Sequence, residues 1–366
     1  MRFFVPTELI IGENCVTEAA EKLRAFGDCC LIVTGKTAAR KSGALADLQT
    51  ALQKGNVRYT VYDGIRQNPT VASCIKAGAF ARECGARFII GVGGGSPLDA
   101  AKAVAVFAAN AALTEAELYA CQWTDVLPVV CIGTTAGTGS EVTPVSVLTD
   151  TNGVKSSIRS DRLYPALSLG DPQYLTSLPD SFLRSCAADA AAHCIESFFG
   201  KSASDISRLF AAHGASILAP LFHKIRKSGA EALTADDRAA LYTASIYGGY
   251  AISVTGTAFP HAMGYFLSER HGVAHGTACA VFLPSFLQYA NDCDPALAGE
   301  FFVRTGCGLE AWCALLQAVA PSCEAHVSAQ EIESMRTRFT GNGGLARSPG
   351  NFDCADALQL LTKLFS

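Results

Sequence analysis

The sequence predicts a parallel α/β domain followed by an all-helical domain, and two observations support this fold class. The first half alternates short, wholly apolar runs with longer Ala-rich segments, which is typical of buried parallel strands joined by helices. The second half contains long Ala-rich segments without further strand-turn-helix units. The length of 366 residues agrees with two domains of roughly 150 residues or more. We place these domains at residues 1–165 and 166–366.

Strands and helices alternate in the first half at the spacing expected of such a domain. Apolar runs predict strands at residues 29–34, 58–62, 88–92 and 128–132. Helices are expected between them at residues 44–53, 71–83 and 100–109. In the second half we expect helices at residues 181–199, 204–227, 235–253, 277–290 and 309–319, a loop at 340–353 and a final helix at 354–365.

The composition excludes several classes of protein. With 49% hydrophobic and 17% charged residues and a mean hydropathy of +0.24, the chain cannot remain unfolded in water. The 29 basic and 33 acidic residues leave a net charge of −4, which argues against broad electrostatic binding to nucleic acid or anionic lipid. We therefore expect neither nucleic acid nor a membrane as a partner.

The cysteine pattern and the N-terminal segment indicate a cytoplasmic protein. Fifteen cysteines without repeated CxxC or CxxH spacing are typical of free thiols in a reducing compartment. Pro6 and Glu8 interrupt the apolar run that a signal peptide would need. Two stretches without Asp, Glu, Lys or Arg, residues 239–268 and 272–291, carry Gly, Ser, Thr, His and Pro, so we expect buried helices there and not membrane spans.

A glycine-rich loop follows the strand expected at residues 88–92. In GVGGGSPLD, Gly93, Gly94 and Gly95 precede Ser96, the expected N-cap, with Pro97 as the first helical residue and Asp99 in the first turn. Glycines without Cβ let backbone amides approach a diphosphate, which a helix N-terminus stabilises. An ordinary tight turn is the alternative, but it would hardly need three glycines.

A second loop rich in hydroxyl groups follows the strand expected at residues 128–132. The segment CIGTTAGTGSEVT offers Thr134, Thr135, Thr138 and Ser140 as hydrogen-bond donors to phosphate or ribose. Alone it would indicate only a loop, but together with the glycine-rich loop it suggests the two ends of a dinucleotide. The Walker motif GxxxxGK[ST] is absent from the sequence.

Four residues in the second half form a dispersed set of possible metal ligands. Asp189 and His193 are four residues apart and share one face of a helix, and His261 and His275 lie within the uncharged stretches. One carboxylate and three imidazoles suit Fe(II) or Zn(II). The alternative is a surface carboxylate and three histidines satisfied inside the core.

Five segments resemble the signatures of the iron-containing (group III) alcohol dehydrogenase family across nearly the whole chain: GGGSPLDAAKAVA, TTAGTGSEVT, DPQYLTSLP, DAAAH, and HAMGY with AHG. The resemblance implies a dehydroquinate synthase-like fold, with a Rossmann-like dinucleotide-binding domain, a helical domain, and a cleft between them for metal and cofactor. The residues that match the family's metal ligands are Asp189, His193, His261 and His275. The residues that match its cofactor contacts are Gly94, Gly95, Ser96, Asp99, Thr135, Thr138 and Lys155.

The chain departs from the family's common pattern after the strand at residues 29–34. Many members carry Asp there, which accepts from the ribose 2′-OH of NAD and repels a 2′-phosphate. Here Gly35 takes that place, followed by Lys36, Arg40 and Lys41. We therefore expect NADP to be accepted and preferred over NAD. In the alternative, the basic residues merely face solvent and NAD still binds.

A second departure concerns the proton relay. Many members have a second histidine four residues after the third metal ligand, where this chain has Tyr265. Tyr265 and His271 are the candidate catalytic residues for proton transfer. The alternatives are that Tyr265 only packs in the core and that His271 is merely solvated.

These observations predict a metal-dependent NAD(P) oxidoreductase that interconverts a small alcohol with its aldehyde or ketone. We also expect a homo-oligomer, namely a dimer. A lyase of the dehydroquinate synthase type is the nearest rival, but residues 187–199 and 255–267 contain no Lys or Arg for a phosphorylated acid. A cofactor-binding protein without turnover is a third possibility, against which the complete ligand set argues.

Overall fold

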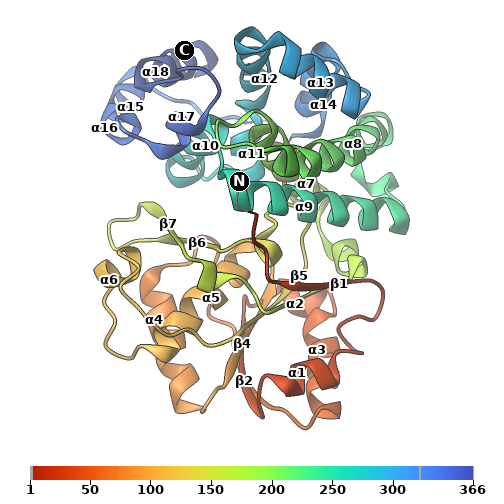
Figure 1. Ribbon diagram of the computed structural model, residues 1–366, viewed down its shortest axis with the longest axis vertical. Coiled ribbons are helices and arrows are strands. Elements are labelled where there is room, and N and C mark those ends of the chain that lie inside the picture. The colour runs from red at the N-terminus through yellow and green to blue at the C-terminus, as the bar shows by residue number, and fades with distance from the viewer. Residues whose placement is uncertain (1–2, 321–322, 366) are drawn as a thin grey trace. The chain divides into compact units, whose positions relative to one another are not determined.

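The computed structural model describes residues 3–320 and 323–365 and divides into two compact units (Figure 1). The first unit is Phe4–Leu178, and the second begins at Pro179 and includes Phe3. The boundary expected at residue 165 is therefore too early. The reason is a strand that the sequence analysis missed, Leu167–Gly170, which pairs with two other strands of the first unit.

The first unit is built on a six-stranded parallel sheet, which confirms the predicted α/β class. The strand order is β1-β8-β5-β4-β2-β3. The strands are β1 (Glu8–Ile11), β2 (Cys29–Thr34), β3 (Arg58–Tyr62), β4 (Phe88–Gly93), β5 (Val129–Gly133) and β8 (Leu167–Gly170). Every residue of β2, β4, β5 and β8 is buried, as expected when helices cover both faces of a parallel sheet. A separate antiparallel pair consists of β6 (Val145–Thr149) and β7 (Lys155–Arg159).

Helices cover both faces of this sheet. Successive residues of a strand point to opposite faces and therefore contact different helices. The helices are α1 (Ala20–Ala25), α2 (Ala38–Lys41), α3 (Ala44–Lys54), α4 (Val71–Glu83), α5 (Gly95–Ala109) and α6 (Glu115–Tyr119). Leu31 and Val33 belong to the core formed with α4 and α5, whereas Cys30 and Ile32 belong to the core formed with α1 and α3. This is the period of two that a strand imposes on its side chains.

The second unit is entirely helical over the residues that the structure describes. Its α-helices are α7 (Asp180–Phe199), α8 (Asp205–Ser228), α9 (Ala235–Thr255), α10 (Phe259–Arg270), α11 (His275–Ala280), α12 (Leu283–Cys293), α13 (Pro295–Thr305), α14 (Leu309–Val319), α15 (Ala329–Ser334), α16 (Arg336–Phe339), α17 (Gly343–Arg347) and α18 (Cys354–Phe365). Two expectations were wrong here. The helix expected at 277–290 is split into α11 and α12, and the loop expected at 340–353 contains α17. Pro284 in the first turn of α12 explains the split, because proline favours a helix start over a helix interior.

Helix α7 lies at the centre of this unit and packs against α8, α9 and α11. Glycines on its neighbours allow the close approach. A Cβ at Gly214 of α8 would lie 2.6 Å from Cys194 Sγ, and one at Gly248 of α9 would lie 3.1 Å from His193 Cβ. Two residues of the DAAAHC segment are thus held by helices that have no side chain at the point of contact.

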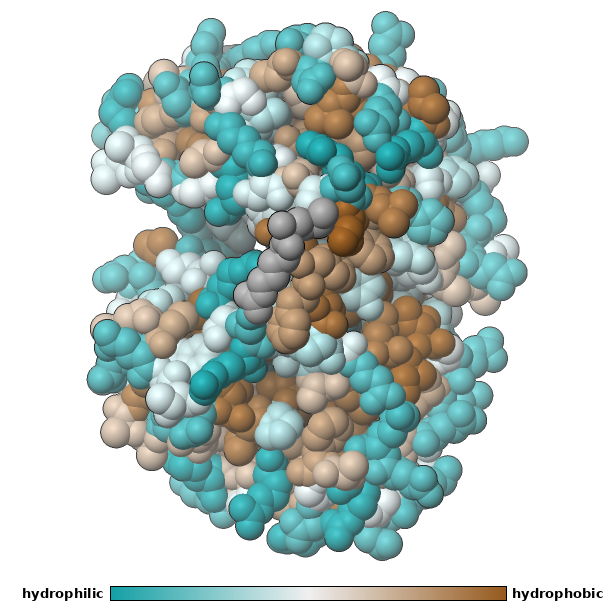
Figure 2. All heavy atoms as spheres, viewed as in Figure 1, coloured by the Kyte–Doolittle hydropathy of each residue, from teal (hydrophilic) through white to brown (hydrophobic). Residues whose placement is uncertain are grey.

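The surface is mixed in polarity on the face that Figure 2 shows, where hydrophilic residues surround smaller groups of hydrophobic ones (Figure 2). All fifteen cysteines are free thiols, as the sequence pattern predicted. Among the helices described, none combines the length and apolar character needed to cross a membrane.

Candidate metal and cofactor sites

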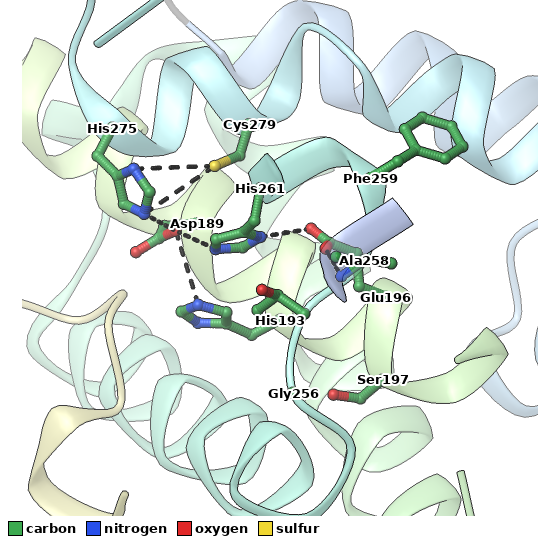
Figure 3. A network of polar contacts seen from close by, with 12 residues as sticks. Asp189, His193, Glu196, Ser197, Gly256, Ala258, Phe259, His261, His275 and Cys279 are labelled. Atoms are coloured by element: carbon green, nitrogen blue, oxygen red, sulfur yellow. Dashed lines mark hydrogen bonds and ion pairs between the residues drawn. The ribbon is translucent and has the colours of Figure 1, made fainter. Parts of the chain in front are cut away.

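Three helices of the second unit bring the predicted metal ligands together around one carboxylate oxygen (Figure 3). The Nε2 atoms of His261, His275 and His193 lie 3.5, 3.7 and 3.9 Å from Asp189 Oδ1. Asp189 and His193 come from α7, His261 from α10, and His275 is the first residue of α11. The rings of His193 and His261 are stacked, with centroids 4.7 Å apart. Residues separated by 86 positions in the sequence therefore share one small volume.

The polar atoms at the centre of this cluster are buried yet make no hydrogen bond. Asp189 Oδ1 and His261 Nε2 are both in this condition, although their residues are only 2% exposed. Buried polar groups are normally paired, and an unpaired one costs about 1–3 kcal/mol. Metal bonds of about 2.0–2.3 Å in tetrahedral geometry hold donor atoms roughly 3.3–3.8 Å apart. The observed separations are close to that range, so the donor set fits a divalent metal.

Glycine at position 276 explains how His275 reaches α7. A Cβ on Gly276 would lie 1.8 Å from the carbonyl oxygen of Ser185 and 2.9 Å from Asp189 Cβ, so no other residue fits without displacing a helix. The backbone amide of Thr277 then donates to Ser185 Oγ at 3.1 Å. The sequence HGT thus carries both the predicted ligand and the contact that positions it.

The sequence analysis missed Glu196, which contacts His261 from the side away from Asp189. Its Oε1 atom lies 2.6 Å from His261 Nδ1, and its Oε2 accepts from the Ala258 amide at 2.5 Å. In Figure 3 His261 lies between the two carboxylates. A ring nitrogen held by a carboxylate leaves the other nitrogen directed at a metal. The signal was present, because Glu196 is seven residues after Asp189 and three after His193, on the same helix face.

Cys279 was also missed. It is fully buried on α11, four residues after His275, and its Sγ atom lies 3.9 and 4.0 Å from the two ring nitrogens of His275. One donor atom each from Asp189, His261, His275 and Cys279 all lie within 4.8 Å of one another. The spacing of four residues was the available signal.

The charges of the cluster favour an ionised carboxylate. Burial by itself would raise the pKa of Asp189, but the surrounding His193, His275 and His261 hold it below its usual range. Burial likewise opposes charge on His261, yet its neighbours raise its pKa well above the usual value. The neighbours that raise the pKa of His261 are Cys279, Glu196 and Asp189. Burial raises the pKa of the Cys279 thiol to about 11.

The two candidate proton-transfer residues have different surroundings. The Tyr265 ring stacks on the His275 ring, with centroids 5.6 Å apart and planes 12° from parallel. His271 follows α10; its Nε2 lies 3.5 Å from Glu331 Oε1, and its ring packs against Phe266. Tyr265 therefore contacts a predicted metal ligand, whereas His271 contacts Glu331 and Phe266.

In the first unit, the two predicted cofactor loops are packed directly against each other. A Cβ at Gly94 would lie 3.1 Å from Thr135 Cγ2, and one at Gly95 would lie 2.7 Å from Thr138 Cγ2. The absence of a Cβ at these glycines therefore allows the two loops to pack together, in addition to letting backbone amides approach a phosphate. Helix α5 begins at Gly95 with Gly94 as an N-cap that lacks a side chain.

The expectation that Ser96 is the N-cap was wrong, since helix α5 starts before it. Its Oγ instead accepts from the amide of Asn68 at 3.3 Å. The first turn of α5 consequently has no capping side chain, which leaves its amides available to an anion.

Asp99 and Ser140 join the two loops through partly buried hydrogen bonds. Asp99 accepts from Ser140 Oγ at 2.6 Å and from the Val147 amide at 2.9 Å. Lys102, which is fully buried and was not predicted, donates to Ser140 Oγ at 2.8 Å and to the carbonyl of Val145 at 2.8 Å. Burial raises the pKa of Asp99 and lowers that of Lys102. These side chains are used within the protein to hold the loops in place.

Two other predicted cofactor residues, Thr134 and Lys155, are placed by backbone pairing. Thr134 is buried and its amide donates to the carbonyl of Gly93 at 2.9 Å, which ties the ends of β4 and β5 together. Lys155 begins β7 opposite Thr149 and is half-buried.

The residues that bear on cofactor choice follow β2. Gly35 is half-buried, and a Cβ there would lie 3.2 Å from the carbonyl oxygen of Ile65, a tight but adjustable contact. Lys36 is exposed, and Arg40 lies 3.3 Å from Asp63 Oδ2. Part of the predicted positive charge is therefore already paired with a carboxylate.

Comparison with known proteins covers both units. Residues 6–172 match the family model for iron-containing alcohol dehydrogenase, and residues 185–335 match that for the C-terminal region of the Fe-containing alcohol dehydrogenase family. A 1,3-propanediol dehydrogenase of Citrobacter freundii is 30% identical over 295 residues, which are 78% of this chain and 74% of the relative.

Solved structures agree over the full length of the chain. An iron-containing alcohol dehydrogenase from Thermotoga maritima superposes with a TM-score of 0.91 at 30% identity, covering 100% of this chain and 99% of the other. A sulfoacetaldehyde reductase from Bifidobacterium kashiwanohense, solved in complex with NAD+, superposes with a TM-score of 0.89 at 25% identity, covering 100% and 98%.

Proposed function

The chain belongs to the iron-containing alcohol dehydrogenase family, and on that premise we propose how its own residues interconvert a small alcohol with its aldehyde or ketone. The enzyme is an NAD-linked oxidoreductase with a dehydroquinate synthase-like fold. When bound, the metal supplies a Lewis acid at the substrate oxygen and the nicotinamide supplies or accepts the hydride.

We assign the metal to Asp189, His193, His261 and His275. Glu196 accepts from His261 Nδ1, which leaves Nε2 of that ring as the donor atom and prevents the ring from turning. Asp189 contributes the negative charge, because its neighbours keep it ionised. A metal held by these residues would place a fixed positive charge next to the substrate oxygen, where the reaction develops negative charge.

We assign the cofactor to the loops after β4 and β5. The uncapped first turn of α5, at Gly94, Gly95 and Ser96, is placed to bind a diphosphate through backbone amides. Thr134, Thr135, Thr138 and Lys155 are the proposed further contacts. Asp99 and Ser140, which we expected to contact the cofactor directly, act mainly by holding the two loops together.

The observation that carries this function is the convergence of three imidazoles on one buried, unpaired carboxylate oxygen. The test is an assay of aldehyde reduction and alcohol oxidation with both cofactors, on protein reconstituted with Fe(II). Metal-dependent turnover of a simple aldehyde supports the proposal. Stoichiometric metal and cofactor binding without turnover of any substrate in a broad panel contradicts it.

The identity of the favoured cofactor is a separate proposal. We propose that NADP is accepted and preferred, since position 35 carries no carboxylate to repel a 2′-phosphate. Lys36 and Lys41 are exposed and can reach a phosphate, whereas Arg40 would have to leave Asp63.

The rival lyase reaction is not favoured. The relatives that match the chain are dehydrogenases and reductases. The helix segments around the metal cluster carry no basic residue, and Arg347, which packs beside Gly256, donates to the backbone carbonyl of Thr257. A neutral substrate suits this environment better than a phosphorylated acid.

Three further properties complete the proposal. Fe(II) is the metal we expect, with Zn(II) as the alternative. The free thiols favour a cytoplasmic location. A homodimer is the expected assembly, to be measured by light scattering combined with size-exclusion chromatography.

A further inference from the structure

We propose that Cys279 is a further donor to the metal, so that this centre offers sulfur in addition to nitrogen and oxygen ligands. The inference rests on the proposed function, because it concerns the same metal. It goes beyond the ligand set that the sequence pattern predicts, which contains no thiol.

The position of the sulfur atom carries the proposal. Cys279 Sγ lies 3.9 and 4.0 Å from the ring nitrogens of His275, and it falls within 4.8 Å of donor atoms of Asp189 and His261. Figure 3 shows the sulfur on the same side of the cluster as the His275 and His261 rings. For metal–nitrogen and metal–sulfur bonds of about 2.1 and 2.3 Å, tetrahedral donors lie roughly 3.6 Å apart. The sulfur lies about 0.3–0.4 Å beyond this separation from the His275 nitrogens and within 4.8 Å of the Asp189 and His261 donor atoms. It would be a fifth protein donor beside the four residues assigned above, and five-coordinate zinc is known in catalytic sites.

Two glycine contacts hold Cys279 in this position. Gly276 brings the start of α11 against α7, as described above. Gly264 of α10 lies so close to α11 that a Cβ there would be 3.0 Å from the Cys279 amide and 3.1 Å from its Sγ. Gly264 is three residues after His261, so both lie on the same face of α10. That face carries the imidazole and, because Gly264 has no side chain, leaves room for the Cys279 thiol.

A buried cysteine is ordinarily a small apolar residue in a core. Cys279 differs from that case because its sulfur contacts ring nitrogens, beside two buried polar atoms that make no hydrogen bond. Those two atoms, Asp189 Oδ1 and His261 Nε2, indicate a cation independently of the cysteine. A sulfur ligand would increase the preference of the centre for Zn(II) and Co(II) over hard cations such as Mn(II).

The direct test is electronic absorption of the full-length protein with Co(II) in the metal site. Sulfur bound to Co(II) gives an intense near-ultraviolet charge-transfer band that nitrogen and oxygen ligands do not give. We expect this band in the wild type and its loss in Cys279→Ser and Cys279→Ala. Cys307→Ser, which changes another buried cysteine of the helical unit, should keep the band.

A second measurement uses competition with a chelator. Cys279→Ser should lower the affinity for Zn(II) by at least about tenfold, the lower end of what loss of a partner outside the ligand shell costs. The affinity for Mn(II) should change less, because a hydroxyl suits a hard cation.

The outcomes separate this inference from the proposed function. Stoichiometric Co(II) in the wild type without the charge-transfer band overturns the sulfur donor and leaves the metal-dependent reaction standing. A band that survives in both Cys279 variants also overturns it. Wild-type protein that binds no divalent metal overturns both proposals.

Discussion

At the scale of single residues, the proposed metal cluster contains buried polar atoms that have no hydrogen-bond partner within the protein. Asp189 Oδ1 faces three imidazoles and is buried without a hydrogen bond. A bound cation would therefore remove the cost of an unpaired buried oxygen and also form new metal–ligand bonds. Among the four proposed ligands His275 has the most exposed side chain, at 32%, so it can be changed with the least disturbance to the core.

We therefore expect His275→Ala to lose most of its metal while remaining folded. Elemental analysis after gel filtration should show about one metal per wild-type chain and much less in the variant. His223→Ala, which removes an exposed histidine of α8, is the matched control and should retain the wild-type content. Equal metal content in both variants would show that His275 is not a ligand.

Glu196 should influence the metal without touching it. We expect Glu196→Gln to lower metal affinity by about 10- to 100-fold, the usual cost of losing a partner that orients a ligand. The reason is that the Glu196 carboxylate both orients His261 and keeps its Nε2 free. Chelator competition measures the affinity, and circular dichroism checks the fold. An affinity within twofold of the wild type would assign Glu196 a purely structural role.

The Tyr265→Phe variant tests whether the phenol of Tyr265 transfers the proton in place of the histidine that is common in the family. Since the ring stacks on His275 and Phe keeps the ring, we expect Tyr265→Phe to retain most activity, with a loss below about tenfold or 1.4 kcal/mol. The measurement is kcat across the pH range with a simple aldehyde. A loss of about 10²- to 10⁴-fold, as is typical of general acid–base residues, would make Tyr265 the catalytic acid.

We propose that the segment after β2 sets the choice between NAD and NADP, and Gly35→Asp tests this proposal. The aspartate should shift preference toward NAD, because a carboxylate accepts from the ribose 2′-OH and repels a 2′-phosphate. The contact with the Ile65 carbonyl at 3.2 Å requires only a small adjustment. The ratio of kcat/KM for the two cofactors measures the effect. A wild type that already strongly prefers NAD contradicts the proposed NADP preference.

At the scale of secondary structure elements, the close approach of α11 to α7 depends on Gly276, which has no side chain at the point of contact. Gly276→Ala should displace α11, lower the free energy of unfolding by about 1–3 kcal/mol, and weaken metal binding. Urea denaturation and metal titration measure these effects. Gly299→Ala is the control, because that helical glycine has open space around its Cβ position and alanine favours a helix. Equal stability of the two variants would contradict the packing argument.

At the scale of the whole molecule, the metal and cofactor sites described here are built by different units. The cofactor loops belong to Phe4–Leu178 and the metal cluster to the unit that begins at Pro179. Ligands stabilise the segments that bind them. Hydrogen exchange with Zn(II) alone should protect α7, α10 and α11, and exchange with the dinucleotide alone should protect the loops after β4 and β5. Protection of the same segments by both ligands would contradict this assignment.

Much of the architecture is determined by local sequence pattern. The bounds of β2, β3, α4, α14 and α18 agree with those predicted. The local signals are clearest for β2, which is buried throughout, and for α4, which Thr70 caps. The strands at Glu8–Ile11 and Leu167–Gly170 were missed because four residues are too few to show a pattern. Their pairing with each other is a long-range property, and it moved the domain boundary beyond residue 165.

The sequence by itself determined the fold class and the family, and it singled out four candidate metal ligands, since residue type and spacing along a helix carry that information. Only the tertiary structure brought Glu196 and Cys279 to the cluster and paired Asp99 with Ser140. The physical reason is that a side chain's role depends on the atoms packed around it. Those atoms come from helices distant in sequence, whose approach is set by residues such as Gly276 and Gly264.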